Sequence, residues 1–391
     1  MITITKAYKV EISPTPIQRE QLERIAAAVR FVYNAALTYR DTRWRMGGGG
    51  VGWIDMAAEL REMLLSGDLP DELAWLGDVP RESLNAALQN LDRAMTAFFR
   101  RVKRGEAPGF PRYKARSRGH GGFKFFSVVT TTEASVRLPK IGTIALREVG
   151  YLPVGTRLKI RSGSVTERAV RWYVSVAVNE ERPDPVAGTG RLAVHLGAKQ
   201  LATIHDGQMI ETIPNPPQLK QHLDRLARLQ RVVARKIEWQ TKRRSGRTVE
   251  RERAQQKVAE QYKRIADIRA DAIHRLTTRL TRERRPAELV VETWEFPEGV
   301  RRTASGTAWG EIGRQLEYKA TWYGVRIIRT PRYFPSSSMC SACGVIAGGS
   351  SGQRIFVCAA CGHSEDRESN AVRNVFRYSG PSSEESLEPD R

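Results

Sequence analysis

The four cysteines of this chain lie in two closely spaced pairs within one short stretch of sequence. Cys340 and Cys343 form the first pair, Cys358 and Cys361 form the second, and fourteen residues separate the pairs. Each Cys-x-x-Cys pair makes a tight turn that presents two thiolates, and the intervening loop allows the four sulfurs to surround one zinc ion. Because every ligand is a cysteine, no coordination position remains for a catalytic water. We therefore predict a structural zinc ribbon over 336–362, with two disulfides or free thiols as the alternative.

Positive charge is the main feature of the composition. The 64 lysine and arginine residues outnumber the 43 aspartate and glutamate residues, which gives a formal net charge of +21. An excess of this size indicates a polyanionic partner. No apolar run approaches the roughly 18 residues that a membrane span requires. We therefore expect nucleic acid rather than a membrane as the partner, and the cytoplasm or bacterial nucleoid as the location.

One basic segment alternates cations with aromatic rings. It begins in the last turn of a helix predicted over 80–104 and continues through 108–114 into a possible strand at 123–126. Aromatic rings stack on bases while cations meet phosphates, so this pattern favours nucleic-acid binding. The alternatives are a solvated helix end and a strand whose aromatic side chains face the core.

A second basic segment consists of two long helices predicted over 217–243 and 248–282. Apolar residues recur along one face of each helix, whereas arginine and lysine residues crowd the outer faces. A merely solvated face is the alternative. Over both segments the candidate nucleic-acid-binding residues are Arg100, Arg101, Lys103, Phe110, Arg112, Tyr113, Lys114, Lys124, Arg225, Arg228, Arg231, Arg235, Lys236, Arg243 and Arg244.

Apolar periodicity predicts the elements that hold these residues. In the first half, alternation over 2–12 predicts a strand, and short alternating stretches within 123–178 predict a small antiparallel barrel that this strand completes. Helical spacing predicts a helical region inserted into the barrel. Its helices are expected from about residue 17, over 54–65 and over 80–104.

The second half alternates strands and helices in the manner of an α/β domain. A linker over 180–190, rich in proline and glycine, precedes it. The final residues, 379–391, are rich in serine, proline and glutamate, which indicates disorder. Strands are predicted over 191–196, 200–205, 208–213, 288–292 and 325–329, and helices over 217–243, 248–282 and 307–323.

Several motifs in this order make the chain resemble the TnpB family. These are compact RNA-guided proteins of bacterial insertion sequences, related to type V CRISPR effector nucleases. The resemblance covers about residues 1–377. The motifs that carry it are Ala7-Tyr8-Lys9 with Pro14-Thr15-Pro16, Arg30-Phe31-Val32-Tyr33-Asn34, Phe98-Phe99-Arg100-Arg101 with Pro108-Gly109-Phe110-Pro111, Leu196-Gly197-Ala198-Lys199, Val290-Val291-Glu292, Tyr318-Lys319-Ala320 and the stretch 335–375.

The resemblance implies a multidomain α+β fold. It also implies a guide RNA and a double-stranded DNA target whose short flanking motif is read by the N-terminal half, and we expect one protein chain on each RNA. The implied parts are a wedge β-barrel (1–12 and 106–182), a helical recognition insertion (13–105), a RuvC-like domain with an RNase H fold (186–335 and 363–378) that carries a helical hairpin (217–282), the zinc ribbon (336–362) and a disordered tail (379–391).

In that family three carboxylates build a nuclease site that holds Mg²⁺. The corresponding positions here are His195, where aspartate is expected, Glu292, which matches, and Glu368, where aspartate is expected. Two-metal hydrolysis needs hard oxygen ligands that hold the ions about 3.5–4 Å apart. Imidazole offers a softer nitrogen and no bridging oxygen, and Glu368 is longer than aspartate by one methylene. Asp206 and Asp366 lie nearby, and we interpret them as loop or cap residues rather than substitutes.

These departures predict a protein that still binds nucleic acid but has lost its nuclease site. Our hypothesis is a nuclease-inactive, TnpB-like protein that occupies DNA through a guide RNA, without a Mg²⁺ centre, and represses transcription by blocking polymerase. One alternative is an active, Mg²⁺-dependent, RNA-guided DNA endonuclease of a transposon. Two others are an RNA-binding remnant that sequesters a transcript and a zinc-ribbon transcription factor that works without RNA.

Overall fold

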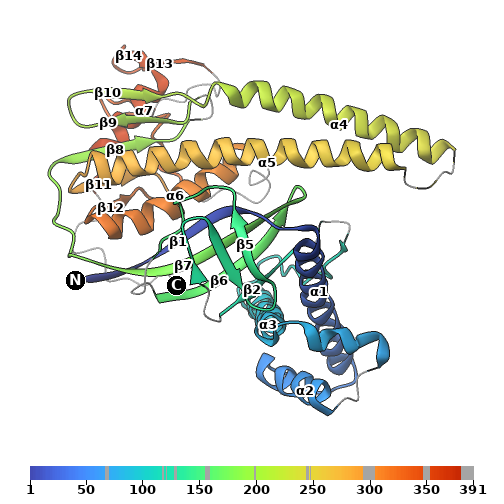
Figure 1. Cartoon of the computed structure of the whole chain (residues 1–391). Helices are drawn as coiled ribbons and strands as arrows, with labels where there is room; N and C mark the ends of the chain where they lie inside the picture. Colours follow the sequence, from blue (N-terminus) through green and yellow to red (C-terminus); the bar gives the residue numbers. More distant parts are fainter. Residues whose placement is uncertain are drawn as a thin grey trace. The chain divides into compact units, whose positions relative to one another are not determined.

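The computed structural model consists of two compact units, Met1–Arg182 and Pro183–Arg391, which are described in turn (Figure 1). None of the helices that the structure describes combines the length and the apolarity that crossing a membrane demands. The described residues are 1–66, 70–116, 119, 121–126, 130–154, 159–197, 200–243, 246, 248–293, 304–346 and 353–379.

The first unit contains a long sheet and a group of helices that lie between its first and second strands in sequence. The predicted strand over 2–12 and all three predicted helices are confirmed to within a few residues, and a 3-10 helix, η1, adds to them. The elements are β1 (Ile2–Ser13), α1 (Pro16–Arg45), α2 (Trp53–Ser66), η1 (Asp71–Asp78), α3 (Arg81–Lys103), β2 (Gly122–Phe125), β3 (Thr130–Thr131), β4 (Ser135–Leu138), β5 (Gly142–Leu146), β6 (Lys159–Arg168) and β7 (Arg171–Arg182).

The start of α1 follows from its local sequence. The Thr15 hydroxyl accepts a hydrogen bond from the backbone N–H of Gln18 at 3.3 Å, and the Gln18 side chain accepts one from the backbone N–H of Thr15 at 3.1 Å. This reciprocal arrangement satisfies donors that the helix itself leaves unpaired. Pro16 occupies the first helical position, where its missing N–H costs nothing.

The strands of the first unit form one antiparallel sheet in the order β2-β6-β7-β1-β5-β4-β3. Among the described residues no ladder joins β2 to β3, so the predicted closed barrel is wrong and the sheet is open. The reason lies in the core. Val10 and Ile12 of β1 share one apolar cluster with Leu22 of α1 and Leu84 of α3, so helices cover the sheet face that closure would have buried.

The second unit is built on a mixed sheet in the order β10-β9-β8-β11-β12. β8, β11 and β12 are parallel, whereas β8, β9 and β10 form an antiparallel meander. The five predicted strands and three predicted helices of this half are confirmed to within a few residues, and η3, β13 and β14 add to them. In chain order the elements are β8 (Arg191–His195), β9 (Ala202–His205), β10 (Ile210–Ile213), α4 (Gln218–Lys242), α5 (Val249–Thr278), the π-helical turn η3 (Arg279–Glu283), β11 (Glu288–Val291), α6 (Ala304–Tyr323), β12 (Arg326–Arg329), β13 (Ile355–Val357), β14 (Ser364–Asp366) and α7 (Arg367–Arg377).

Alternation along the central strands decides which helix each side chain meets. Leu192 and Val194 pack with residues of α5 and α6, whereas Ala193 of β8 and Val290 of β11 pack with Val372 of α7. Successive strand residues face opposite sides of a sheet. The residue that ends β8 and the residue that follows β11 are therefore directed toward α7.

The helices α4 and α5 lie side by side as a long hairpin (Figure 1). Polar side chains join them: the amide of Gln261 donates to the backbone oxygen of His222 at 2.8 Å, and the amide of Gln230 donates to the Tyr262 hydroxyl at 2.6 Å. Only Leu226 and Gln240 of α4 are buried among the described residues. Most of the α4 surface is therefore left to solvent or to a partner.

We predict that Gly163→Ala destabilises the first unit. Gly163 of β6 is paired with Phe125 of β2, and a Cβ atom at position 163 would overlap the fully buried Phe125 ring. Overpacking of this kind costs about 1–3 kcal/mol of unfolding free energy. Thermal and urea denaturation measure the loss. Gly77→Ala is the control, because a Cβ atom there meets open space; equal stability of the two variants would contradict the prediction.

Candidate active site, metal centre and nucleic-acid interface

Three residues that lie far apart in sequence meet where β8, β11 and α7 come together. His195 ends β8, Glu292 directly follows β11, and Glu368 lies in the first turn of α7. Parallel strands bring their carboxyl ends to one edge of the sheet, so β8 and β11 place His195 and Glu292 next to each other. The helix α7 packs against the same sheet face through Val372 and supplies Glu368.

The His195 imidazole forms a bridge between the two glutamates. Its Nδ1 lies 2.7 Å from Oε2 of Glu292, and its Nε2 lies 2.9 Å from Oε2 of Glu368. The other carboxylate oxygen of Glu292 accepts a hydrogen bond from the Ser336 hydroxyl. All three of the bridged side chains are largely buried.

The two carboxylates hold the imidazole in its charged form. Burial alone would lower the pKa of His195, but the negative charge of Glu292 and the hydrogen bonds to Glu292 and Glu368 outweigh it and raise the pKa to about 10. A protonated ring donates from both nitrogens, so it can satisfy both glutamates at once. The group is thus an imidazolium held between two carboxylates.

A pair of Mg²⁺ ions does not fit this donor set. Mg²⁺ prefers near-octahedral oxygen ligands at about 2.0–2.1 Å. Both oxygens of Glu292 already accept from His195 or Ser336, and one oxygen of Glu368 forms an ion pair with His195. The imidazolium also places a positive charge where a cation would have to enter.

Two nearby aspartates have local roles that match their interpretation as loop and cap residues. Oδ1 of Asp206 accepts from the backbone N–H groups of Gln208 and Met209 in the β9–β10 turn. Oδ1 of Asp366 accepts from the N–H groups of Glu368 and Ser369 at the start of α7, which is the usual role of an N-cap aspartate.

The four cysteines form a compact cluster of free thiols. Their Sγ atoms all lie within 4.8 Å of one another, with Cys340 and Cys361 3.7 Å apart and Cys343 and Cys358 also 3.7 Å apart. Zinc–sulfur bonds of about 2.3 Å at tetrahedral angles separate sulfurs by about 3.8 Å. The four thiols therefore fit a zinc ion, which would supply structure rather than chemistry, and they do not form the alternative disulfides.

Backbone amides of the second pair favour the thiolate that zinc requires. The N–H groups of Cys361 and Ala360 lower the pKa of Cys358, against the opposing effect of burial. The thiolate is the form of cysteine that binds metal.

Two buried asparagines of α7 connect the ribbon to the candidate active site. The Asn370 side chain accepts from the Ser341 N–H at 2.8 Å and donates to the Met339 backbone oxygen at 2.8 Å. The Asn374 side chain donates to the backbone oxygens of Ser336 and Met339. These contacts fix α7, which carries Glu368, against the segment whose Ser336 bonds Glu292. Sequence reasoning did not single out Ser336 or Asn374, because a lone polar residue in a loop or helix carries no pattern.

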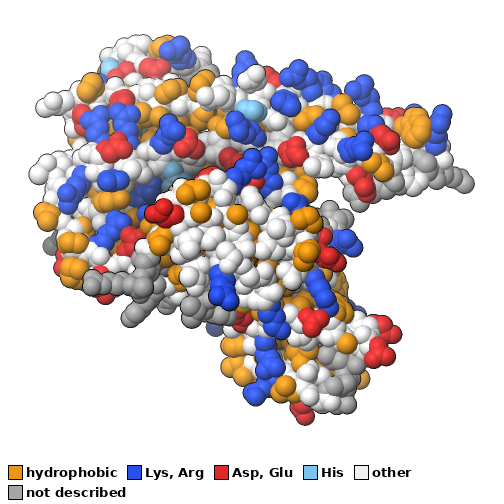
Figure 2. Space-filling view, viewed as in Figure 1, with side chains coloured by type: hydrophobic (Ala, Val, Ile, Leu, Met, Phe, Trp, Pro, Cys, Tyr) orange, Lys and Arg blue, Asp and Glu red, His pale blue; other side chains and the backbone are white. Residues whose placement is uncertain are grey.

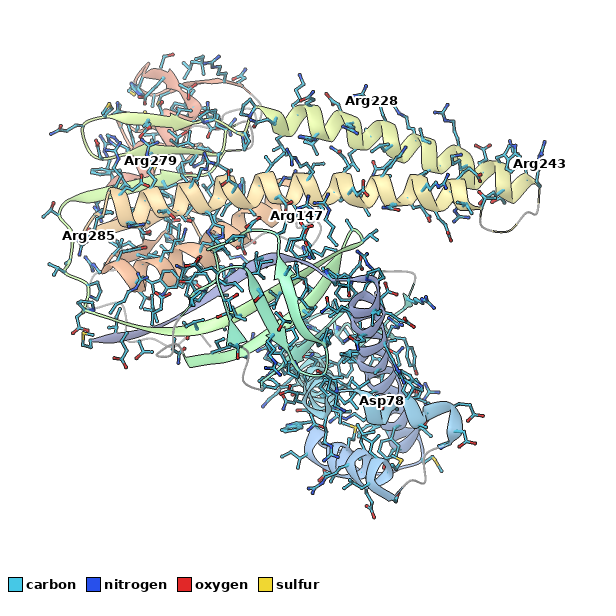
Figure 3. The ribbon with its side chains drawn as sticks, in the orientation of Figure 1. Asp78, Arg147, Arg228, Arg243, Arg279 and Arg285 are labelled. Carbon is cyan, nitrogen blue, oxygen red and sulfur yellow. The ribbon has the colours of Figure 1, made fainter. Side chains whose placement is uncertain are left out.

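The α4–α5 hairpin presents one of the two groups of candidate nucleic-acid residues, and Figure 2 shows lysine and arginine side chains gathered over it. Figure 3 labels Arg228 on the side of α4 away from α5, and Arg243 at the hairpin end, where its guanidinium lies over the Trp239 ring at 4.4 Å. Within the described part of the chain, no acidic side chain pairs with the exposed arginines of α4. Arg244 lies outside the described residues. The exposed set is Arg225, Arg228, Arg231, Arg235 and Arg243, and Lys236 is half-buried.

In the first unit, the segment that alternates cations with aromatic rings has some side chains in the core and others on the surface. Phe123 and Phe125 are buried, so for these two rings the core alternative is confirmed. Lys124, between them, is half-buried, whereas Phe110 and Tyr113 are exposed. The exposed cations of this segment are Arg100, Lys103, Arg112 and Lys114.

Two cations of this segment have contacts within the protein. Lys114 is exposed as a whole, but its ammonium lies 4.0 Å from the centre of the Tyr33 ring. The partial loss of water around the ammonium lowers the pKa of Lys114. The Asn34 side chain holds the backbone of Lys114 through bonds of 2.8 and 3.0 Å. Arg101 donates to the backbone oxygens of Pro108 and Gly109, which gives it a positioning role beside any contact to phosphate.

We predict that His195 keeps its proton well above neutral pH. Its folded-state pKa of about 10 lies above the ordinary value of 6.5. The stabilisation is therefore fully present below about pH 6.5 and is lost as the pH rises through 10, by about 1.4 kcal/mol for each unit of pKa difference. Nitrogen NMR of the ring should show the imidazolium at pH 8. His195→Asn is the control, since it cannot titrate; a ring that titrates near pH 6.5 would refute the bridge.

Loss of the zinc site should loosen the helix that carries Glu368. A structural zinc ion supplies several kcal/mol of stability to the fold around it, and the Asn370 and Asn374 contacts pass this order to α7. Chelation, or Cys358→Ser, is expected to lower the melting temperature by several degrees and to speed amide hydrogen exchange in α7. A chelator should have no further effect on Cys358→Ser. Unchanged exchange in α7 would disprove the connection.

Three family models match parts of the chain. The "Helix-turn-helix domain" matches residues 1–49, the "Probable transposase" model of IS605 OrfB matches 173–294, and the "Cas12f1-like, TNB domain" matches 309–375. In the structure, residues 1–49 contain the strand β1 and the helix α1. The third match includes all four cysteines.

Full-length relatives cover almost the whole chain. A "Putative RNA-guided DNA endonuclease" of Streptomyces pristinaespiralis is 32% identical over 96% of this chain and 90% of its own length. The "Putative RNA-guided DNA endonuclease InsQ" of Escherichia coli K12 is 27% identical over 95% of this chain and 91% of its own length. Among solved structures, a "Cas12f1-sgRNA-target DNA complex" matches with a TM-score of 0.49 and 11% identity, covering 96% of this chain and 99% of that chain. On the strength of the full-length relatives, the chain belongs to the TnpB family, also known as the IS605 OrfB family.

Proposed function

We propose that this protein binds DNA through a guide RNA, holds the target without cutting it and represses transcription from that site. Its parts would be those that the family resemblance implies. A wedge domain and a helical recognition insertion would form the first unit, and a RuvC-like domain with its zinc ribbon would form the second. The site at His195, Glu292 and Glu368 would be a degenerate nuclease site.

The observation that carries the proposal is the imidazolium bridge between Glu292 and Glu368. Two buried carboxylates without a cation between them repel each other, and in a two-metal nuclease Mg²⁺ supplies the positive charge. Here His195 supplies it from within the chain, at 2.7 and 2.9 Å. Entry of a metal would require removal of a proton that the site holds strongly, and the position would still lack a bridging oxygen.

RNA and DNA as partners are supported by charge and by the relatives. The net charge is +21, and the exposed arginines of α4 have no acidic partner within the described residues. The two full-length relatives are named as RNA-guided DNA endonucleases, both with the qualifier "putative". If base pairing selects the sequence, the protein needs only to hold the heteroduplex by charge and shape. A complex that stays on DNA would then obstruct polymerase.

The names of those relatives also favour the second candidate, an active RNA-guided DNA endonuclease. One experiment separates the two functions. The wild type and the double variant His195→Asp/Glu368→Asp are purified with their co-purifying RNA. Each is then mixed with guide-matched and mismatched DNA in Mg²⁺ or Mn²⁺. Retention, cleavage and melting temperature are measured on the same preparations.

We expect the wild type to retain matched DNA uncut, with a melting temperature that does not respond to Mg²⁺. The double variant replaces the imidazolium with carboxylates that repel one another, so Mg²⁺ should raise its melting temperature and guide-dependent cleavage should appear. Glu292→Gln in the wild type should leave DNA retention unchanged. Guide-dependent cleavage by the wild type would reject the proposal in favour of the endonuclease. Equal retention of matched and mismatched DNA would favour an RNA-binding remnant.

A further inference from the structure

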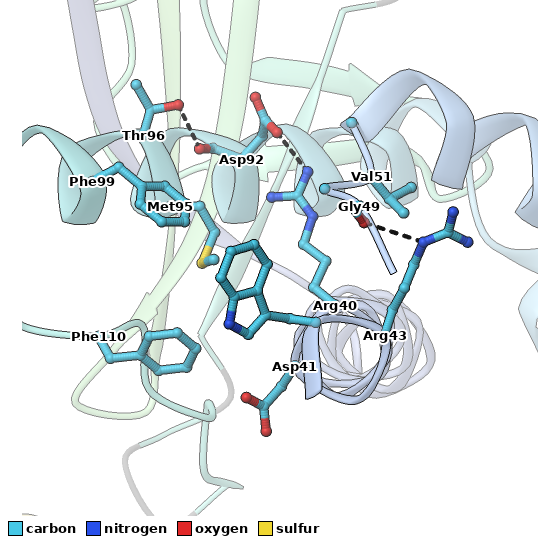
Figure 4. A pocket seen from close by; sticks show the side chains of 13 residues that line it. Arg40, Asp41, Arg43, Gly49, Val51, Asp92, Met95, Thr96, Phe99 and Phe110 are labelled. Carbon is cyan, nitrogen blue, oxygen red and sulfur yellow. Dashed lines mark hydrogen bonds and ion pairs between the residues drawn. The ribbon is translucent and has the colours of Figure 1, made fainter. Parts of the chain in front are cut away.

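A cavity of about 390 Å³ opens between the ends of α1 and α3 in the first unit (Figure 4). Residues at three- and four-residue spacing line it from each helix, because such residues share one helix face. The apolar seam between the helices is buried at Leu37 and Leu91. Further along, the same seam is exposed at Trp44 and Phe99, which are 69% and 52% accessible.

Three aromatic side chains give the cavity flat apolar walls. Trp44 comes from α1, Phe99 from α3 and Phe110 from the loop that follows α3. Phe110 is fixed by an edge-to-face contact with Phe98, whose ring centre lies 5.3 Å away. Aromatic rings exposed in this way stack readily on unpaired bases.

Two arginines hold the loops that complete the walls. Arg101 donates to the backbone oxygens of Pro108 at 2.7 Å and Gly109 at 3.0 Å. Gly109 has a φ of 57°, so a side chain there would be strained, and a Cβ atom would press on the same guanidinium. On the other side, Arg43 donates to the backbone oxygen of Gly49 at 3.2 Å (Figure 4). The cavity is thus built from ordered parts.

The lining of the cavity also includes a guanidinium and a carboxylate. Arg40 is 91% buried, since its side chain keeps only 9% of its exposure, and it donates to Oδ1 of Asp92 at 2.6 Å. Within the described residues its Nε has no partner. The Asp92 side chain is 35% exposed and bonds Arg40 through Oδ1. A carboxylate has about four acceptor positions, so Asp92 retains capacity for a ligand while Arg40 fixes its orientation.

These features specify the occupant. A flat ring fits the aromatic walls, and the basic last turns of α1 and α3, with Arg43, Arg45, Arg100 and Lys103, favour an occupant that carries phosphate. Guanine presents two adjacent donors, N1–H and N2–H, which match the two oxygens of a carboxylate. The pairing edges of adenine, cytosine and uracil each contain an acceptor. That acceptor would face the Asp92 carboxylate, itself an acceptor, and neither group would have a hydrogen-bond partner.

We propose that this cavity binds an unpaired guanosine of the guide RNA. The inference rests on the proposed RNA-guided function and adds a single-base contact to it. RNA rather than DNA is chosen because RNA loops present unstacked bases, whereas a base in the DNA duplex must first be unpaired at a cost of a few kcal/mol. The volume lies within the range of about 300–1,000 Å³ that small-ligand sites occupy.

The test measures binding of the full-length chain to fluorescein-labelled oligouridine that carries one central guanosine or, in a second probe, one central adenosine. The ratio of the two dissociation constants isolates the base contact, because both probes have the same phosphate charge. We expect the guanosine probe to bind about tenfold more tightly. Asp92→Asn keeps the size of the side chain and should abolish this preference.

Variants of Trp44 and Phe110 test the aromatic contacts independently of Asp92. Trp44→Ala and Phe110→Ala are each expected to weaken the guanosine probe by about five- to hundredfold, the range for loss of one base-stacking contact. Tyr333→Ala, which removes an exposed aromatic ring of the second unit, should have no effect. Melting temperatures identify any variant that fails to fold.

Three results would overturn the assignment. The first is a guanosine-to-adenosine ratio that is the same in the wild type and in folded Asp92→Asn. The second is unchanged binding by folded Trp44→Ala and Phe110→Ala. The third is a preference seen with the corresponding deoxyoligonucleotides and not with RNA, which would assign the cavity to DNA. Guide-dependent DNA retention is measured separately and tests the proposed function. It does not depend on the guanosine-to-adenosine binding ratios, so the two proposals can fail independently.

Discussion

The charge balance between His195, Glu292 and Glu368 is the constraint on which the second unit depends. Two carboxylates meet there because β8 and β11 are parallel neighbours and α7 packs across them. Burial of two negative charges next to each other is costly unless a positive charge joins them. The chain supplies that charge itself, through an imidazole whose two nitrogens face the two glutamates. The same geometry that would assemble a metal centre thus assembles an internal ion group.

The zinc ribbon and the ion group are connected through one helix. Asn370 and Asn374 are almost fully buried and bond to the backbone at Ser336, Met339 and Ser341. The segment so fixed also provides the Ser336 hydroxyl to Glu292. A ribbon without catalytic chemistry therefore acts on the site by holding α7 in place. The cysteines and the start of α7 lie in one stretch of sequence, 335–375, and these contacts join the two in the structure.

In the first unit, hydrogen bonds within the protein fix the backbone that carries the candidate nucleic-acid-binding residues. Arg101, a candidate phosphate contact, also bonds the backbone oxygens of Pro108 and Gly109. Asn34 bonds the backbone of Lys114, a second candidate. The cations that remain exposed then project from fixed backbone. Less conformational entropy is lost when a preorganised surface binds.

The sequence by itself determined the longer helices, most strands and the cysteine cluster, since these depend on local spacing and on residue type. It also showed a histidine at position 195, where the family resemblance implies an aspartate. Tertiary structure alone decided that the sheet of the first unit stays open, because that outcome depends on helices covering one face of it. It also decided that His195 pairs with both glutamates, because His195 and Glu292 are 97 residues apart and meet only through sheet pairing. The pairing of Arg40 with Asp92, in a cavity that exposed aromatic rings also line, could not be predicted from the sequence either. The two residues are 52 positions apart in sequence, with α2 and η1 between their helices, and no local periodicity records a contact over that distance.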